Sequence, residues 1–269
     1  MFFAPTLLAL TSPHLHNDVR VLCLSSGNAD GIGALRTGEL VKSCEELGVV
    51  EGARGSSCWV EGAEGERKGQ GKLELGRVVV VEHPQLQDGM GIFWPTQVIA
   101  SVLRRVLKQW GTQEAEAGGN IGKGDHQLGE WLPHLLITFD SSGISGHSNH
   151  ISALSGAKEY THSLTTETKP RLYTLTSISI LRKYASILDF PLTYITSKSG
   201  NGGHQWVFVN TLEQFQRARR AMTHAHKSQM RWFRWGWIWA SRYMVLNHLA
   251  EEVHDVGLHE DKRGGEDEL

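Results

Sequence analysis

The sequence predicts an α/β fold of the Rossmann-like kind, with a mostly parallel sheet and helices on both faces. Short apolar runs typical of buried strands alternate along the chain with longer segments of helical periodicity. With 269 residues and a hydrophobic content of 40%, the chain is long enough for one domain with a sizeable core. We therefore expect a single domain over residues 1–250, followed by an acidic tail at residues 251–269.

The individual elements follow from the apolar pattern and from the residues that end each run. Residues 1–10 are apolar but lack a basic start and a cleavage site, so they predict a core helix rather than a signal peptide. Apolar runs predict strands at residues 19–25, 78–81, 135–139 and 171–176. Helical periodicity predicts helices at residues 35–47, 96–110, 150–161 and 212–225.

Two glycine-rich, polar segments interrupt this alternation, at residues 51–76 and 111–130. The first contains seven glycines among many charged residues. Segments of this length and composition are typical of solvated loop insertions. A lid over a substrate is the functional alternative for the same segments.

One strand leads into a segment that predicts a functional site. After the strand come Thr138-Phe139-Asp140, and Gly143 and Gly146 then allow a tight turn before the next helix. His147 and His150 would share one face of that helix's first turn. Open α/β sheets bind their ligands where a strand ends and a helix begins. Exposed or structural histidines are the alternative interpretation of the pair.

This segment resembles the signature of the N-acetylglucosaminyl-phosphatidylinositol de-N-acetylase family, a membrane-associated branch of the LmbE-like zinc deacetylases. In that family the corresponding segment is a strand, Thr-Phe-Asp, a glycine-containing turn, Ser-Gly-His, one residue and Asn-His. The resemblance extends along most of the chain, to residues 1–6, 22–31, 36–40, 86–89 and 228–234.

The resemblance also implies a zinc site that this sequence does not complete. Family members carry a first strand ending in Ala-His-Pro-Asp-Asp-Glu, which supplies two zinc ligands and the general base, and this sequence begins after that position. His150 matches the third ligand, and His147 matches the residue that stabilises the oxyanion or protonates the leaving amine. A catalytic zinc normally has three protein ligands. We therefore expect an incomplete zinc site, a sheet without its first strand and a chain of low stability.

A further histidine, His83, follows the expected strand at residues 78–81 and precedes a proline, as in the absent motif. Its acidic residue, Asp88, lies too far along the chain for that motif. We expect His83 to be structural rather than a metal ligand.

Arg36 and Asp88 match recurrent positions of the family, and we expect them to recognise the sugar or the phosphate of a substrate. A guanidinium group binds phosphate through two parallel hydrogen bonds, and a carboxylate accepts from sugar hydroxyls. The alternatives are a surface arginine paired with Glu39 or Glu45, and a turn residue in Asp88-Gly89.

The composition limits the class of partner and the compartment. The net charge is −2 and the 27 lysines and arginines are dispersed, so we expect no nucleic-acid binding. The three cysteines show no Cys-x-x-Cys spacing, which suits a reducing compartment. No apolar stretch reaches the length expected of a spanning helix.

The C-terminal segment at residues 232–243 is rich in tryptophan and contains two internal arginines. Aromatic residues interleaved with arginine favour the headgroup region of a membrane. A core helix packed beneath the sheet is the alternative, because aromatic residues at helical spacing are often buried. A lipid-linked substrate favours the membrane interface.

The resemblance therefore implies hydrolytic removal of acetate from N-acetylglucosaminyl-phosphatidylinositol during GPI-anchor biosynthesis. The expected cofactor is zinc, and the expected location is the cytoplasmic face of the endoplasmic reticulum membrane. Because the metal site is incomplete, we also consider a non-catalytic, sugar-phospholipid-binding or complex-forming remnant. A deacetylase of a soluble glucosamine conjugate is the third hypothesis.

Overall fold

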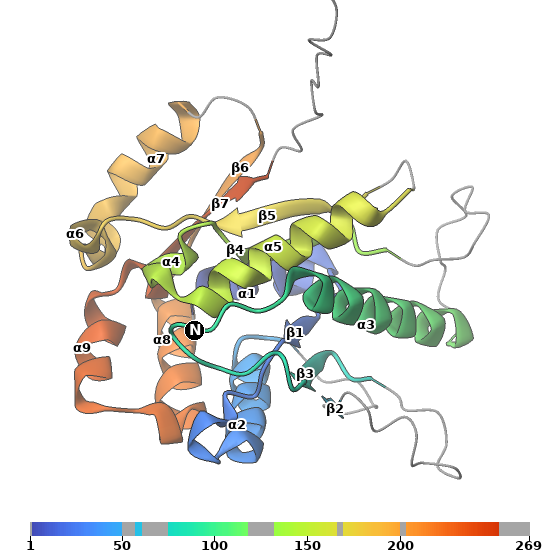
Figure 1. Cartoon of the computed structure of the whole chain (residues 1–269). Coiled ribbons are helices and arrows are strands. Elements are labelled where there is room, and N and C mark those ends of the chain that lie inside the picture. The colour runs from blue at the N-terminus through green and yellow to red at the C-terminus, as the bar shows by residue number, and fades with distance from the viewer. Residues whose placement is uncertain are drawn as a thin grey trace, which may run out of the picture.

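The computed structural model describes residues 2–49, 57–60, 75–117, 132–165, 169–199 and 203–252. The strands are β1 (Val21–Cys23), β2 (Ser57–Val60), β3 (Val78–Glu82), β4 (Leu135–Phe139), β5 (Arg171–Leu175), β6 (Gln205–Val209) and β7 (Leu246–Glu251). The α-helices are α1 (Ala4–Leu10), α2 (Gly33–Glu46), α3 (Thr96–Glu116), α4 (Gly143–Gly146), α5 (Ser148–Ser163), α6 (Ile180–Lys183), α7 (Phe190–Ser199), α8 (Leu212–Arg220) and α9 (Trp232–Ala240). The arrangement is shown in Figure 1.

The strands form two sheets rather than one. In the first sheet β3 lies between β1 and β2, and both pairs are parallel. The second sheet has the order β4-β5-β7-β6, in which β4 and β5 are parallel and β7 is antiparallel to both of its neighbours. The predicted α/β class and its parallel pairs are confirmed, and β7 adds an antiparallel element.

Helices cover both faces of the first sheet, as predicted. Successive residues of a strand point to opposite faces. In β3, Val79 and Val81 pack in a core with α3 and α5, whereas Val78 packs with Cys44 of α2. All three valines are fully buried.

The approach of α3 to α5 depends on a glycine. A Cβ atom at Gly156 of α5 would lie 2.3 Å from Cβ of Ile99 in α3. Real Cβ atoms do not approach so closely, so the absence of a side chain at Gly156 sets the spacing of these two helices.

Helix α1 confirms the predicted first core helix and is fastened to the second sheet. Ala4 and Leu8 are buried in a cluster with α8, Ile238 and Met244. The side-chain oxygen of Asn247, in β7, accepts hydrogen bonds from the backbone N–H and the hydroxyl of Thr6 at 3.1 and 2.8 Å. Asn247 also donates to the carbonyl oxygen of Phe2 at 2.9 Å. This buried amide thereby joins residues at opposite ends of the sequence.

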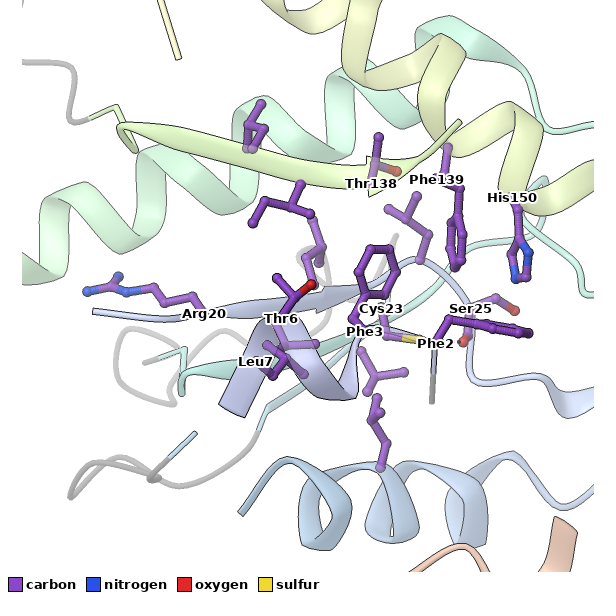
Figure 2. A pocket seen from close by; sticks show the side chains of 18 of the residues that line it. Phe2, Phe3, Thr6, Leu7, Arg20, Cys23, Ser25, Thr138, Phe139 and His150 are labelled. Atoms are coloured by element: carbon purple, nitrogen blue, oxygen red, sulfur yellow. Dashed lines mark hydrogen bonds between the residues drawn. The ribbon is translucent and has the colours of Figure 1, made fainter. Parts of the chain in front are cut away.

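A cavity of about 1530 Å³ lies between the two sheets. Among the described residues β1 pairs only with β3 and β4 pairs only with β5, so each of the two strands has one open edge. All residues of β1 and β4 line the cavity, and Figure 2 places Ser25 and Phe139 toward the same end of it. The cavity therefore lies between the open edges of these two strands.

The predicted loop insertions need correction where the structure describes them. Residues 57–60 form β2, whose Trp59 and Val60 are favourable strand residues. Helix α3 continues to Glu116, six residues into the second predicted insertion, because Trp110 and Gln113 remain buried on its inner face. Glu251, placed in the predicted acidic tail, is the last residue of β7. The remainder of the insertions and residues 253–269 lie outside the described residues.

Candidate active site

The site lies after β4, in a turn with an unusual backbone. Gly143 and Gly146 have φ values of +57° and +70°, and Ile144 between them has φ +65°. A β-branched residue rarely adopts this conformation, which costs on the order of 1–3 kcal/mol. The side chain of Ile144 is buried in the core of the second sheet, and its backbone N–H donates to the Ser177 hydroxyl at 2.8 Å.

Asp140 holds the same turn from the other side. Its carboxylate accepts from the backbone N–H and the hydroxyl of Ser177, both at 2.6 Å, and from the N–H of Ser142 at 3.1 Å. These hydrogen bonds join the segment after β4 to the segment after β5. They fix the path of the chain into α5 and so the positions of the two histidines.

His147 is the N-cap of α5 and has a defined tautomer when neutral. Its Nδ1 accepts a hydrogen bond from the backbone N–H of Asn149 at 3.3 Å. The proton of the neutral ring therefore resides on Nε2, which lies 3.9 Å from Oδ1 of Asp88. His147 can present this N–H to a substrate oxygen or transfer a proton to a leaving group.

His150 is oriented the opposite way. Its Nδ1 lies 3.0 Å from the carbonyl oxygen of Gly143, so Nδ1 donates and Nε2 keeps a free lone pair. Burial lowers the pKa of His150 and favours the neutral ring. The ring stacks on Phe139 at a centroid distance of 3.8 Å and on His147 at 4.7 Å. As predicted, the two histidines lie side by side, and Figure 2 shows His150 beside Phe139.

Asp88 reaches the histidines because the loop after β3 is fastened to the start of α5. The Asn149 side chain accepts from the N–H of Gly89 at 3.3 Å and donates to the carbonyl oxygen of Gln87 at 3.2 Å. Ser148 donates to the carbonyl oxygen of Met90 at 2.7 Å. The Asn that precedes His150 in the motif therefore positions the loop that carries Asp88.

Arg36 comes to the same place from α2. Its guanidinium donates to the carbonyl oxygen of Gly27 and pairs with Asp30 at 2.7 Å, rather than with Glu39 or Glu45. A Cβ atom at Gly27 would lie 3.0 Å from Nη1 of Arg36 and 3.4 Å from Oδ2 of Asp88, so both side chains converge on this glycine. Gly27, with φ +68°, allows that approach.

All four predicted site residues, Arg36, Asp88, His147 and His150, line the cavity between the two sheets. His83 is not among its lining residues, and its Nδ1 accepts from the backbone N–H of Gln85 at 3.0 Å. This local hydrogen bond agrees with the structural role expected for His83.

Comparison with known proteins identifies the family. The chain is 33% identical over 249 residues to a probable N-acetylglucosaminyl-phosphatidylinositol de-N-acetylase of Schizosaccharomyces pombe, with 93% of this chain and 80% of that protein covered. It is 32% identical over 253 residues to the N-acetylglucosaminyl-phosphatidylinositol de-N-acetylase of Bos taurus, covering 93% of this chain and 77% of the bovine one. The chain belongs to this family. No protein-family model matches the sequence.

Arg234 of α9 is a further charged residue at the cavity of this de-N-acetylase family member, one that the motif analysis did not single out. It lines the cavity, and its Nη1 donates to Oε1 of Gln229 at 3.1 Å. Burial lowers the pKa of Arg234, and the positive charges of Arg36 and Arg231 act in the same direction. The sequence could have indicated a basic site here, because residues 227–250 contain four lysines and arginines and no acidic residue.

The described residues do not make up a zinc site. Within the described ranges no group of three or more His, Cys, Asp and Glu side chains is placed to hold a metal ion. His150 has the tautomer of a ligand, but one imidazole does not provide the three protein ligands of a catalytic zinc. We therefore derive no chemical step through a metal.

Within the Trp-rich segment, three of the four tryptophans are exposed, contrary to the core alternative, whereas Ser241, Arg242 and Tyr243 at its end are buried. In α9, Trp232, Trp235 and Trp239 face solvent, whereas Ile238 is fully buried and Trp237 is partly covered. In the described part of the chain no helix has both the length and the apolar character needed to cross a bilayer.

Proposed function

We propose that this chain acts in the hydrolytic removal of acetate from N-acetylglucosaminyl-phosphatidylinositol, a step of GPI-anchor biosynthesis. The observation that carries the proposal is the convergence of His147, His150, Asp88 and Arg36 on one cavity, in a chain of the de-N-acetylase family. The names of the relatives supply the substrate. The residues supply the chemistry described next.

Hydrolysis breaks the amide C–N bond, adds the oxygen of water to the acyl carbon, and leaves a protonated amine. Charge develops on the carbonyl oxygen as water attacks, and the Nε2–H of His147 is a donor suited to that oxygen. The protonated ring can instead give its proton to the leaving nitrogen. Oδ1 of Asp88 lies 3.9 Å from this Nε2.

Zinc is the metal we propose for the lone pair of His150. Because the described residues offer one ligand of suitable orientation, this chain alone is expected to bind zinc weakly and substoichiometrically.

The phosphate of the substrate is proposed to lie against Arg36 and Arg234. Guanidinium groups bind phosphate oxygens through charge-assisted hydrogen bonds, and the single negative charge of a phosphodiester would interact favourably with both cations. The buried Nε of Arg36 has no hydrogen-bond partner among the described residues, so Arg36 retains a donor for a ligand. Arg36→Gln and Arg234→Gln should each weaken binding of the phosphorylated substrate by about tenfold to a hundredfold.

We further propose that the lipid-linked substrate is reached from the cytoplasmic face of the endoplasmic reticulum membrane, with α9 at the interface. The exposed tryptophans of α9 and the nearby Arg231 and Arg234 support this placement. Phe233 and Trp237 of the same helix also line the cavity, so the interface and the site are adjacent.

The test measures acetate release and substrate binding with the purified chain and three variants. His147→Gln should lower turnover by about a hundredfold or more and leave substrate binding nearly unchanged. His150→Gln should lower both the zinc content and turnover. His83→Gln, a histidine outside the cavity, is the matched control and should behave as the wild type.

Binding of the lipid-linked sugar without any turnover, unchanged by His147→Gln, would favour the non-catalytic alternative. Equal turnover on a soluble glucosamine conjugate and on the lipid-linked sugar would favour the soluble-substrate alternative. Either result would replace the function proposed here.

A further inference from the structure

A second apolar surface lies on the segment formed by α6, the 3₁₀ turn η4 (Ser186–Asp189) and α7, which we call the α6–α7 segment. Its exposed side chains include Ile180, Leu181, Tyr184, Leu188, Leu192 and Ile195. Leu181 and Leu188 are 83% and 82% exposed. Contiguous exposed apolar side chains of this size mark an interaction surface.

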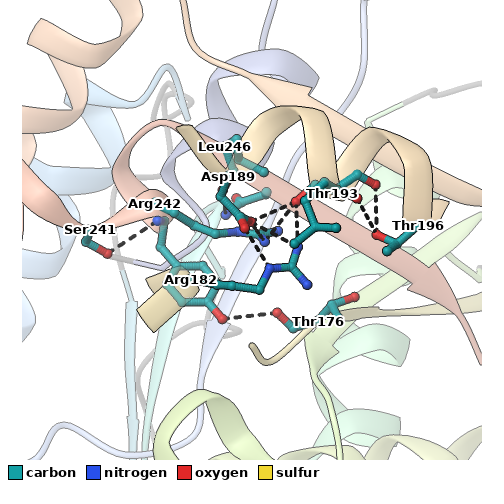
Figure 3. Close-up of polar contacts among 11 residues, drawn as sticks. Thr176, Arg182, Asp189, Thr193, Thr196, Ser241, Arg242 and Leu246 are labelled. Atoms are coloured by element: carbon teal, nitrogen blue, oxygen red, sulfur yellow. Dashed lines mark hydrogen bonds and ion pairs between the residues drawn. The ribbon is translucent and has the colours of Figure 1, made fainter. Parts of the chain in front are cut away.

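The α6–α7 segment is held in a fixed position by a buried ionic network, shown in Figure 3. Asp189 accepts from Nε of Arg182 at 2.6 Å and from the Thr193 hydroxyl at 2.8 Å, and it pairs with Arg242. The side chain of Arg242, in the 3₁₀ turn η7 (Arg242–Met244) before β7, is 0% exposed. The side chains of Asp189 and Thr193 are therefore buried within this network, whereas the large apolar side chains of the segment lie on the outside.

The charge of the α6–α7 segment is one-sided. Asp189 is the only acidic residue at positions 177–199, and it is buried. The basic residues Lys183 and Lys198 are at least partly accessible, and Nζ of Lys198 lies 4.4 Å from the ring centroid of Tyr194. An apolar surface with basic and no accessible acidic groups is complementary to anionic lipid. Two copies of the same surface would place like charges opposite each other, which disfavours self-association.

The α6–α7 segment also adjoins the candidate active site. Tyr184 lines the cavity, and Nζ of Lys183 donates to the Ser145 hydroxyl at 2.6 Å, in the turn just before His147. Figure 1 shows α6, α7 and α9 along one side of the molecule. Two exposed apolar elements, the α6–α7 segment and α9, thus flank residues that line one cavity.

We propose that the α6–α7 segment inserts its apolar side chains into the headgroup boundary of an anionic lipid surface. Together with α9 it then seats the cavity against the membrane, so that a lipid-linked sugar reaches His147 without leaving the bilayer surface completely. The inference extends the proposed function, because the segment's use in catalysis depends on a lipid-linked substrate. Its membrane binding does not depend on catalysis.

The experiment measures sedimentation of the full chain with phosphatidylcholine vesicles, with and without phosphatidylserine. The wild type should bind vesicles that contain phosphatidylserine more tightly, and the binding should weaken with added salt. Leu181→Ser/Leu188→Ser should weaken it by about tenfold or more, because two large apolar side chains no longer enter the interface. Leu15→Ser, at a residue 54% exposed before β1, is the matched control and should bind as the wild type.

Two readouts separate this proposal from its rivals. Vesicle binding that is unchanged in Leu181→Ser/Leu188→Ser would overturn it, as would a wild-type dimer that this double variant abolishes in size-exclusion chromatography with light scattering. Acetate release from a water-soluble N-acetylglucosaminyl-inositol analogue should be equal in wild type and double variant, which also shows that the variant folds. Loss of vesicle binding in the double variant supports this proposal even if neither the wild type nor the variant releases acetate. The absence of acetate release would overturn the proposed function instead.

Discussion

Asp189→Asn should destabilise this protein more than any exposed charge substitution, because Asp189 is the anionic partner of two arginines. Arg182 donates to it at 2.6 and 3.1 Å, and Arg242, which is fully buried, pairs with the same carboxylate. An amide of the same shape keeps the packing but removes the charge. Breaking a buried ion pair from one side costs about 3–5 kcal/mol, since the remaining charge stays buried. At this chain length such a loss lowers Tm by roughly 6–20 °C.

The assay is thermal unfolding followed by circular dichroism, with Asp18→Asn as the matched control. Asp18 pairs with Arg20 at 2.6 Å and with Arg77 at 3.3 Å, but its carboxylate is accessible, so its loss should cost less than about 1 kcal/mol. Equal Tm values for the two variants would refute the argument that the buried network fixes the α6–α7 segment.

The difference in stability between the wild type and Asp189→Asn should depend on pH in a definite direction. Burial opposes ionisation of Asp189, but hydrogen bonds from Arg182 and Thr193 and the charge of Arg242 hold its pKa below the usual value. A lowered carboxyl pKa contributes stability that is present above the unfolded-state pKa of about 3.9 and is lost as the pH falls through the folded-state value. The difference in stability between wild type and Asp189→Asn should therefore shrink below about pH 4.

Two further predictions concern the core. Gly156→Ala should lower the free energy of unfolding, measured in urea, by about 1–3 kcal/mol, because the new methyl group overlaps Ile99. The control is Gly38→Ala in α2, where a Cβ atom meets no atom within 4 Å, and this change should be neutral or stabilising. Burial lowers the pKa values of His226 and His248 to about 4, so both are neutral in the folded state where the unfolded chain takes up protons. The contribution of these two histidines to stability is then complete above about pH 6.5 and is lost as the pH falls toward about 4. Each histidine lowers the free energy of unfolding by up to about 1.4 kcal/mol per pH unit in this range. A free energy of unfolding that does not change with pH in either the wild type or His226→Gln would contradict this.

The sequence was most predictive where apolar runs are uninterrupted. The strand predicted at residues 135–139 has the bounds of β4, and the predicted helix at residues 150–161 lies within α5. The four site residues were found through the motif and the family resemblance, and the structure brings them together. The positions of the loop that carries Asp88 and of the turn after β4 were not predictable, because they depend on hydrogen bonds between residues remote in sequence, from Gly89 to Asn149 and from Ile144 to Ser177.

Strand β7 was missed by sequence analysis because polar residues within it are buried. Strand β7 contains Asn247 and His248, which interrupt its apolar pattern, but both are buried and hydrogen-bonded to distant groups, Asn247 to Thr6 and His248 to Gln205 at 2.9 Å. Arg242 misleads in the same way, since a charged residue usually indicates the surface. The exposed leucines of the α6–α7 segment, Leu181 and Leu188, are the converse case, since leucine is usually buried.

The open space between β1 and β4 has a consequence for how the molecule unfolds. Among the described residues no strand pairing crosses from the first sheet to the second, so no continuous hydrogen-bonded ladder transmits stability between them. The coupling depends instead on contacts such as Ile99 of α3 against Gly156 of α5. Amide hydrogen exchange should then show the two sheets as separate cooperative units with different opening free energies. Contacts between helices, rather than strand pairing, therefore hold the two sheets together.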